Sequence, residues 1–194
     1  RPFSRDRTGI VLAEGAAIVI LEEYHHAIAR RARIYGEVLG YGETFDSYHT
    51  HQPLPSAEYC AKAISNALAD ACLKPEQVDY INPHGTASIL SDKAETLAIK
   101  KAFGHHAYEL SASSTKSMTG HTLGACGALE MVACALMLER QFVHPTINLI
   151  SPDPECDLDF VPNIGRAQSL NRVLSLSAGF GGYNAACVIG TPQE

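Results

Sequence analysis

The sequence predicts a single α/β domain. Short apolar runs typical of strands alternate along the chain with segments whose apolar residues recur at helical spacing. A length of 194 residues suits one domain with its own core, and no repeat or low-complexity linker divides the chain. Hydrophobic residues make up 46% and charged residues 19% of the composition, which indicates a folded rather than a disordered chain.

The N-terminal third is expected to contain a hairpin, two helices and a strand. Residues 9–23, GIVLAEGAAIVILEE, form two strand-like runs joined around Glu14 and Gly15, which predicts a β-hairpin. A basic helix is expected over residues 22–32. The alternation in residues 33–45, RIYGEVLGYGETF, predicts a strand, and the apolar residues between Ser56 and Cys72 recur at helical spacing.

The rest of the chain continues the alternation. The apolar run VDYIN, residues 78–82, predicts a short buried strand, and residues 91–103 predict a helix that ends at Gly104. The remaining expected elements are a strand near 108–112, a long small-residue helix over 120–139, and strand-like runs at 157–161, 173–177 and 185–189. The proline-rich segments HQPLP and SPDPECD are expected to be surface loops.

Charge and hydropathy exclude several classes of protein. The net charge of −6 is spread without a run of either sign, so no nucleic-acid partner is expected. No apolar run approaches the roughly 20 residues that a membrane span needs. The segment RPFSRDRTG at the start of the sequence is charged and turn-like, unlike a signal peptide. We therefore expect a cytoplasmic protein.

The six cysteines and nine histidines do not show the spacing of a metal site. No CxxC pair occurs, which is typical of reduced and mostly buried thiols. The histidine pairs His25–His26 and His105–His106 are adjacent, whereas two ligands on one helix face need a spacing of four. Metal-binding histidines are therefore not expected.

Two loops place titratable residues among small ones directly after predicted strands. The first is NPHGTAS with His84, and the second is SSTKSMTGHTLGACGALE with Lys116 and His121. In open α/β sheets, ligands bind beyond the carboxyl ends of the strands, where both loops are expected to lie. The alternative interpretation is that both histidines are structural and that the small residues permit tight helix packing.

Five ordered motifs resemble the C-terminal half of the β-ketoacyl-acyl-carrier-protein synthases, which are condensing enzymes with the thiolase-like fold. The motifs are RPFSRDRTGIVLAEGAAIVILEE, NPHGTAS, SSTKSMTGHTLGACGALE, HPTINL and GFGGYN. The resemblance covers essentially residues 1–194 and is nearest to the discrete elongating type. It implies a mixed sheet with a buried small-residue helix and covering helices. In the family motif PPTINL the first residue is proline, whereas this chain has His144.

The resemblance also implies the catalytic residues. His84 and His121 match the two histidines that hold the malonyl thioester and promote its decarboxylation. Lys116 matches the lysine that orders this pair, and Glu95 matches the acidic residue that pairs with the lysine. Phe180 matches a gatekeeping aromatic residue.

Further positions match residues that bind the substrate or an ion. Thr86 and Ser88 match hydroxyls that contact the phosphopantetheine arm, and Gly179, Gly181 and Gly182 would let the loop around Phe180 move. The residues Asn82, Glu130 and Ser175 match three positions that hold a structural sodium or potassium ion in some members. This chain has Leu176 where an asparagine is expected, which puts that ion in doubt.

Other departures from the family pattern leave the histidines intact. Ala178 stands where an aromatic residue is usual, which suggests a roomier pocket, and Tyr183 stands where threonine is usual. The family nucleophile is a cysteine in a motif like TACSS within the N-terminal half, and none of the six cysteines lies in such a motif. Cys126 replaces a small residue of the family's GAAG run, so a packing role is favoured over a catalytic one.

The resemblance thus implies a 3-oxoacyl-[acyl-carrier-protein] synthase whose nucleophile lies in a missing N-terminal half. The reaction would be the decarboxylative condensation of malonyl-carrier protein with an acyl thioester, in fatty-acid or polyketide synthesis. No cofactor is expected, because the phosphopantetheine arm arrives on the carrier protein. The expected partners are an acyl carrier protein and the complementary half or chain, in a homodimer or heterodimer. The alternatives are a noncatalytic partner like a chain-length factor, or an interaction module of the same fold.

Overall fold

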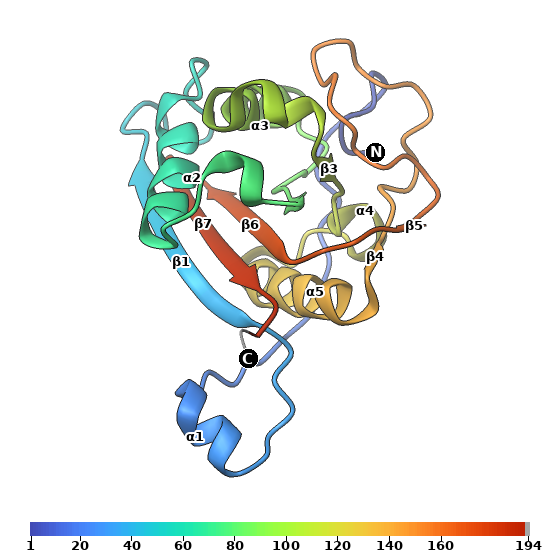
Figure 1. The fold of residues 1–194 in the computed structure, drawn as a ribbon. Coiled ribbons are helices and arrows are strands. Elements are labelled where there is room, and N and C mark those ends of the chain that lie inside the picture. The colour runs from blue at the N-terminus through green and yellow to red at the C-terminus, as the bar shows by residue number, and fades with distance from the viewer. Residues whose placement is uncertain (193–194) are drawn as a thin grey trace.

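The computed structural model describes residues 1–192 and contains one five-stranded sheet with helices on both faces (Figure 1). The strands follow the order β1 (Glu37–Phe45), β7 (Tyr183–Gly190), β6 (Arg172–Gly179), β2 (Tyr80–Asn82) and β3 (Ser111–Ala112). The strands β1, β7 and β6 pair antiparallel, whereas β6, β2 and β3 pair in parallel. The sheet is therefore mixed, as expected. A separate short ladder joins β4 (Phe142–Val143) and β5 (Arg166–Ala167).

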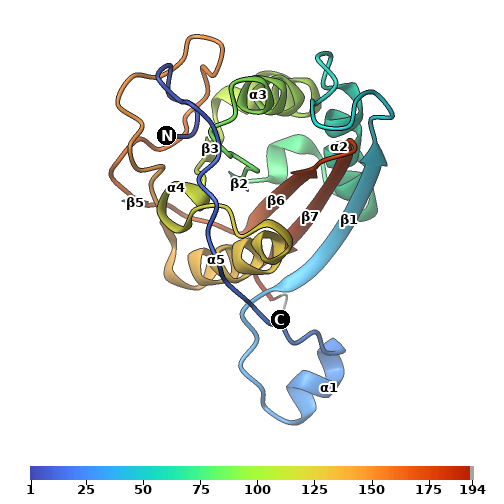
Figure 2. The ribbon, with the colours of Figure 1, turned by 180° about the vertical axis from the view of Figure 1, so that it is seen from behind.

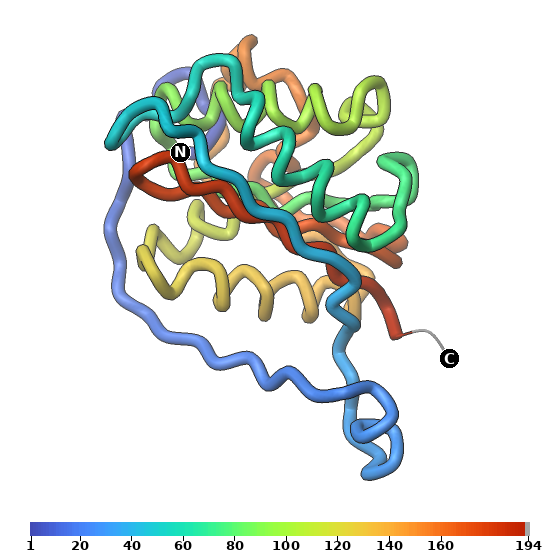
Figure 3. The backbone as a smooth tube through the Cα atoms, turned by 90° about the vertical axis from the view of Figure 1, so that its left-hand side faces the viewer, coloured from blue at the N-terminus to red at the C-terminus, as the bar shows by residue number. Residues whose placement is uncertain are grey.

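Helices cover the two faces of the sheet unequally. The helices α2 (Glu58–Asp70) and α3 (Ile89–Phe103) lie on one face, and α5 (Cys126–Arg140) lies on the other (Figures 1 and 3). The core beneath α2 and α3 includes Ile64 and Ile99, and a second core joins Cys134 of α5 to the sheet. Burial of these apolar faces is the main force that holds the layers together.

The strand β1 packs unusually closely against α2 because two of its residues lack side chains. A Cβ atom on Gly40 would lie 2.5 Å from the carbonyl oxygen of Ala67, and one on Gly42 would lie 2.3 Å from that of Ala63. Any other residue at either position would force the helix away from the sheet. The predicted strand over residues 33–45 and the helix between Ser56 and Cys72 are both confirmed.

The β-hairpin predicted over residues 9–23 is wrong. Residues 9–21, here called the strap, run extended beside α5 without forming a strand (Figures 2 and 3). The strap makes its backbone hydrogen bonds with His121 instead of with itself: His121 donates to Val11 O at 2.8 Å, and Ala13 donates to His121 O at 3.0 Å. A strand-like pattern of residues does not determine which other segment of the chain the extended backbone pairs with. The basic helix is present but shorter than predicted, as α1 (Tyr24–Ala29).

The long helix begins later than residue 120. A single turn, α4 (Lys116–Thr119), ends at Gly120, whose φ of 70° stops the helix. A 3₁₀ turn at Leu123–Ala125 then leads into α5. The interruption has a physical cause, since His121 must be extended to pair with the strap.

Several smaller predictions are confirmed and two need correction. The helix ending at Gly104 and the strands β2, β6 and β7 agree with the sequence analysis. The strand near 108–112 shrinks to β3, because Gly104–Tyr108 forms a 3₁₀ helix, as Pro75–Gln77 also does. The run 157–161 forms only an isolated bridge, between Asp159 and Ser111. Six free thiols are present, and four of them are buried: Cys60, Cys126, Cys134 and Cys156.

A broad apolar surface remains exposed on the strap. The side chains of Ile18 and Ile20 are 89% and 83% exposed. The helix α5 is not buried on all sides either, since Val132 and Leu136 are partly exposed. Among residues 1–192, no helix is long and apolar enough to cross a bilayer.

Candidate active site

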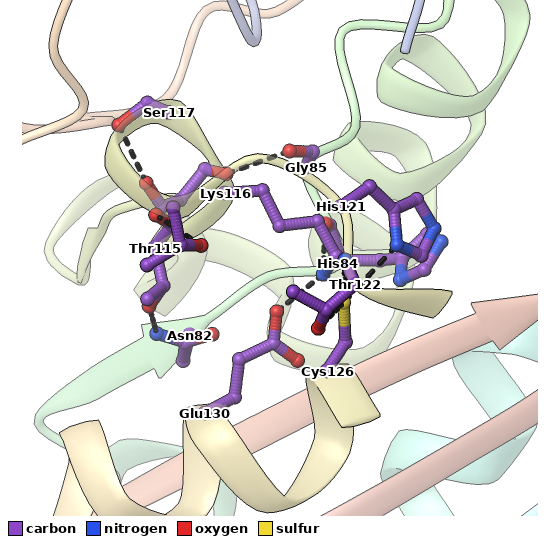
Figure 4. Close-up of polar contacts among 12 residues, drawn as sticks. Asn82, His84, Gly85, Thr115, Lys116, Ser117, His121, Thr122, Cys126 and Glu130 are labelled. Atoms are coloured by element: carbon purple, nitrogen blue, oxygen red, sulfur yellow. Dashed lines mark hydrogen bonds and ion pairs between the residues drawn. The ribbon is translucent and has the colours of Figure 1, made fainter. Parts of the chain in front are cut away.

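Two loops bring His84 and His121 together at one end of the parallel strands. His84 follows β2, and His121 follows α4 on the segment that leaves β3 (Figure 4). Their ring centroids are 5.4 Å apart and the rings are nearly perpendicular, at 84°. The two residues that the sequence singled out from separate loops therefore form one pair.

The backbone around His84 is held from two sides. The buried carboxylate of Glu95, on α3, accepts hydrogen bonds from the amides of His84 and Gly85, the latter at 2.8 Å. The Nζ atom of Lys116 donates to the carbonyl oxygen of His84 at 2.7 Å. Burial raises the pKa of Glu95 to about 8, although the two amides act in the opposite direction.

The expected pairing of Lys116 with Glu95 is wrong. Lys116 instead forms an ion pair with Glu130 of α5, and the two side chains are 3% and 1% exposed. Both oxygens of Glu95 are occupied by the amides of the His84 loop, so this carboxylate holds the loop rather than the lysine. Lys116 thus connects α5 to the His84 loop, because it bonds to both at once.

Both imidazoles are neutral at neutral pH. Burial, together with the charge of Lys116, lowers the pKa of His84 well below its usual value and also lowers the pKa of His121. The amide of Leu123 donates to Nδ1 of His121 at 3.1 Å, so this nitrogen is an acceptor. The proton of neutral His121 therefore resides on Nε2, which can donate to a ligand.

The sulfur of Cys126 contacts the loop that carries His121. Its Sγ atom lies 3.1 Å from Nδ1 of His121, 3.2 Å from the amide of Thr122 and 3.3 Å from the hydroxyl of Thr122. The side chain is buried at the first residue of α5. Cys126 therefore packs beneath the histidine and fixes the turn that follows it.

A cavity of about 360 Å³ opens in front of the two histidines. Of the predicted site residues, its lining includes His84, Thr86, Ser88, Glu95, His121, Gly179 and Phe180. Lys116 and Gly181 are outside the lining, since Lys116 lies behind the histidines and Gly181 lies in the turn beyond Phe180. A cavity of this size with a few converging polar groups is typical of a ligand site.

The turn between β6 and β7 forms one rim of the cavity. Phe180 is 69% exposed there, and its ring packs edge-on against His51 with centroids 5.4 Å apart. Gly181 and Gly182 have φ angles of 84° and 91°, which only glycine adopts readily. The amide of Gly181 donates to the carbonyl oxygen of Thr50 at 2.8 Å, which ties this turn to the 46–54 loop.

The sequence analysis missed Asp46 and His51. Asp46 accepts hydrogen bonds from Asn184 at 2.8 Å and from the amide of Leu54 at 2.9 Å, and its own amide donates to Gly182. The sequence feature that could have revealed them is the polar segment after residue 45, because it follows a predicted strand as the two histidine loops do. Because β1 pairs with β7, that segment lies against the Phe180 turn.

Two buried oxygen atoms near the ion pair have no hydrogen-bond partner among the described residues. They are Oδ1 of Asn82 and Oε2 of Glu130. Ser175 lies directly opposite Asn82 in the register of β2 and β6. Oxygen atoms of this kind suit a hard cation, so the three predicted residues fit a sodium or potassium ion.

Comparisons with known proteins agree with the geometry. The family described as "Beta-ketoacyl synthase, C-terminal domain" matches residues 35–150. The chain is 53% identical to a Synechocystis 3-oxoacyl-[acyl-carrier-protein] synthase 2, over 95% of the chain and 44% of the relative. It is 50% identical to a putative polyketide β-ketoacyl synthase 1 of Streptomyces virginiae, over 100% of the chain and 46% of the relative.

A solved structure gives the same result. The chain superposes, with a TM-score of 0.97 and 43% identity, on a structure described as a type II polyketide synthase acyl-carrier protein in complex with its ketosynthase bound to a hexaketide. The match covers 99% of this chain and 47% of that chain. The chain thus spans about half the length of the relatives that it matches.

Proposed function

Because the chain belongs to the β-ketoacyl synthase family, we propose that it supplies the decarboxylating part of an enzyme that lengthens an acyl chain. The single observation that carries the proposal is the pair of neutral imidazoles, His84 and His121, on the wall of a cavity with Lys116 buried behind them. The proposed substrates are a malonyl unit on an acyl carrier protein and an acyl thioester. The proposed class is 3-oxoacyl-[acyl-carrier-protein] synthase, in fatty-acid or polyketide synthesis.

Loss of carbon dioxide from the malonyl unit needs donors at the thioester oxygen. As the bond to the carboxylate breaks, its electron pair moves into an enolate whose oxygen becomes negative. Nε2–H of His121, and a ring N–H of His84, would donate to that oxygen. Preorganised donors at a developing negative charge are a large source of rate enhancement.

The enolate then attacks the acyl group. In the proposal this group is a thioester on a cysteine of the N-terminal half, and the attack forms a carbon–carbon bond while the cysteine thiolate leaves. The product is a 3-ketoacyl chain on the carrier protein. Thr86 and Ser88, which line the cavity next to His84, would bind the phosphopantetheine arm that delivers the malonyl unit.

The buried charges behind the histidines have a proposed supporting role. Burial and, after it, the charge of Lys116 lower the pKa of both imidazoles, and Lys116 also holds the carbonyl of His84. Asn82, Glu130 and Ser175 would hold a sodium or potassium ion, with the two unpaired oxygens as donors. Such an ion would give the two unpaired buried oxygens of Asn82 and Glu130 a partner that the described residues do not supply.

We expect residues 1–194, expressed by themselves, to self-associate and to form no carbon–carbon bonds. Apolar side chains are exposed on the strap, such as Ile18 and Ile20, and on α5, such as Val132 and Leu136, and exposed apolar surface favours association. Addition of an N-terminal half that carries the nucleophilic cysteine should restore a compact particle and condensation. Light scattering measures the mass, and mass spectrometry detects the 3-ketoacyl product. A well-behaved monomer that condenses acyl and malonyl thioesters unaided would overturn the proposal and would make Cys126 the candidate nucleophile.

We expect Phe180→Ala to lower kcat/KM for condensation by about tenfold, because the ring at the cavity rim would no longer close over the acyl thioester. Phe142→Ala is the matched control, since Phe142 is a partly exposed phenylalanine on β4 that does not line the cavity. Structures of the acylated and free enzyme should show different Phe180 side-chain conformers. Identical conformers together with unchanged kinetics would remove the gate from the mechanism.

A further inference from the structure

A second polar cluster lies behind the histidine pair and includes a histidine that the proposed mechanism does not use. Nε2 of His144 lies 3.0 Å from the hydroxyl of Thr115, and Nδ1 lies 3.2 Å from both the hydroxyl of Ser113 and the carbonyl oxygen of Pro145. The ring also packs edge-on against Tyr80, with centroids 6.4 Å apart. His144 stands where the family motif has proline, whose side chain forms no hydrogen bond.

The neighbours of His144 determine which of its nitrogens carries the proton. The carbonyl oxygen of Pro145 is only an acceptor, so Nδ1 must be the donor in the contact between them. Burial lowers the pKa of His144, so the ring is neutral and Nε2 is left as an acceptor. The hydroxyl of Thr115 therefore donates to Nε2.

This arrangement in turn sets the orientation of the Asn82 amide. Because the proton of the Thr115 hydroxyl is committed to His144, its oxygen is free to accept from Nδ2 of Asn82, at 2.7 Å. The same nitrogen lies 3.4 Å from the hydroxyl of Tyr80. Figure 4 shows the amide nitrogen turned toward Thr115 and the amide oxygen on the opposite side, where Glu130 lies. A flipped amide would place its oxygen against the Thr115 oxygen, with no proton between them.

The same contacts connect the cluster to the catalytic loops. Thr115 directly precedes Lys116, which bonds to Glu130 and to the carbonyl of His84. Asn82 lies two residues before His84, at the end of β2. A change in the orientation of Thr115 or Asn82 would therefore alter the position of Lys116 or of the His84 backbone, which lie one and two residues away.

We propose that His144 is a positioning residue of this site, which accepts from Thr115 and thereby fixes Asn82 and the start of α4 in the orientation that Lys116 and His84 require. The inference rests on the proposed function, because its effect is measured on decarboxylation. It assigns to His144 no contact with the substrate, since His144 does not line the cavity.

The test uses two amide substitutions that separate the two nitrogens of the ring. In His144→Gln the side-chain oxygen can reach the place of Nε2 and accept from Thr115, whereas the shorter side chain of His144→Asn can replace only Nδ1. In a synthase completed with its N-terminal half, His144→Asn should lower kcat for carbon dioxide release about tenfold, with KM for malonyl-carrier protein unchanged. His144→Gln should stay within about twofold of the wild type.

Thr115 provides an independent variant and tests the connection. Thr115→Val removes both the hydrogen bond to His144 and the acceptor for Asn82, so it should lower kcat at least as much as His144→Asn. The double variant should be no worse than Thr115→Val alone, because both substitutions break the hydrogen bond between Thr115 and His144. Thr115→Ser keeps the hydroxyl and should retain activity. His105→Asn is the control, since His105 is exposed on the turn after α3 and does not line the cavity.

A readout other than activity is the side-chain amide of Asn82. In nuclear magnetic resonance spectra of the ¹⁵N-labelled protein, its N–H protons should exchange with solvent faster in His144→Asn than in His144→Gln, because only the first variant releases the Thr115 hydroxyl that holds the amide. Equal kcat values for the Asn and Gln variants, or additive effects of the His144 and Thr115 substitutions, would overturn the inference. That result would leave the proposed function standing as long as His84→Ala still slowed decarboxylation by about two to three orders of magnitude.

Discussion

His84→Ala and His121→Ala should each slow the release of carbon dioxide from malonyl-carrier protein by about two to three orders of magnitude. A loss of this size is typical when one preorganised donor to a developing oxyanion is removed. The two imidazoles lie 5.4 Å apart at one cavity wall and would act on one enolate. The fold-loss of rate in the double variant should therefore be far smaller than the product of the two single fold-losses. Radiolabelled carbon dioxide measures the rate in a synthase completed with its N-terminal half.

The control for this experiment is the other half-reaction. Transfer of an acyl group to the nucleophilic cysteine needs no enolate, so mass spectrometry should find the acyl-enzyme in both variants. His105→Ala, outside the cavity lining, should leave both steps unchanged. Unaltered carbon dioxide release in His84→Ala and His121→Ala would show that the assigned roles are wrong.

The ion pair between Lys116 and Glu130 should give the largest effect on stability. Lys116→Met leaves a carboxylate buried without its partner, which costs about 3 to 5 kcal/mol of the free energy of unfolding. The double variant Lys116→Met/Glu130→Leu removes both charges and should recover most of that loss, but not decarboxylation. Urea denaturation of the completed synthase measures the free energies, and carbon dioxide release measures the rate.

A surface ion pair gives the comparison. Lys93 of α3 and Glu155 form a solvent-accessible ion pair, and Lys93→Met should cost much less stability than Lys116→Met. If Lys116→Met cost no more than Lys93→Met, the buried pair would not stabilise the fold. If the double variant kept full decarboxylation, Lys116 would have no part in the reaction.

Much of the fold follows from the periodicity of apolar residues. The helix α2 buries Cys60, Ile64 and Leu68 on one face, at the spacing from which it was predicted. Gly104 ends α3 as its position after the apolar pattern indicated. The two histidine loops were also found from the sequence, because each follows a strand and is rich in small residues.

The most consequential errors concern which groups pair with each other in space. The strap has a strand-like pattern but pairs with the His121 loop, at a distant point of the chain. Lys116 has a buried acidic partner as expected, but the partner is Glu130 because Glu95 already binds two backbone amides. No local pattern determines which of two carboxylates lies nearer in space. Asp46 was missed for the same reason, since its role depends on the Phe180 turn that packs against it.

The pairing of the strap with His121 also bears on how the protein reaches its native state. Contacts between distant parts of a chain form slowly, because the loop between them must close before the contact stabilises anything. Within this segment the strap is synthesised well before the loop that it holds. The helices α2 and α3 are synthesised in the interval and can pack against each other before that loop exists. We therefore expect the His121 loop to become ordered only after these more local contacts between helices have formed.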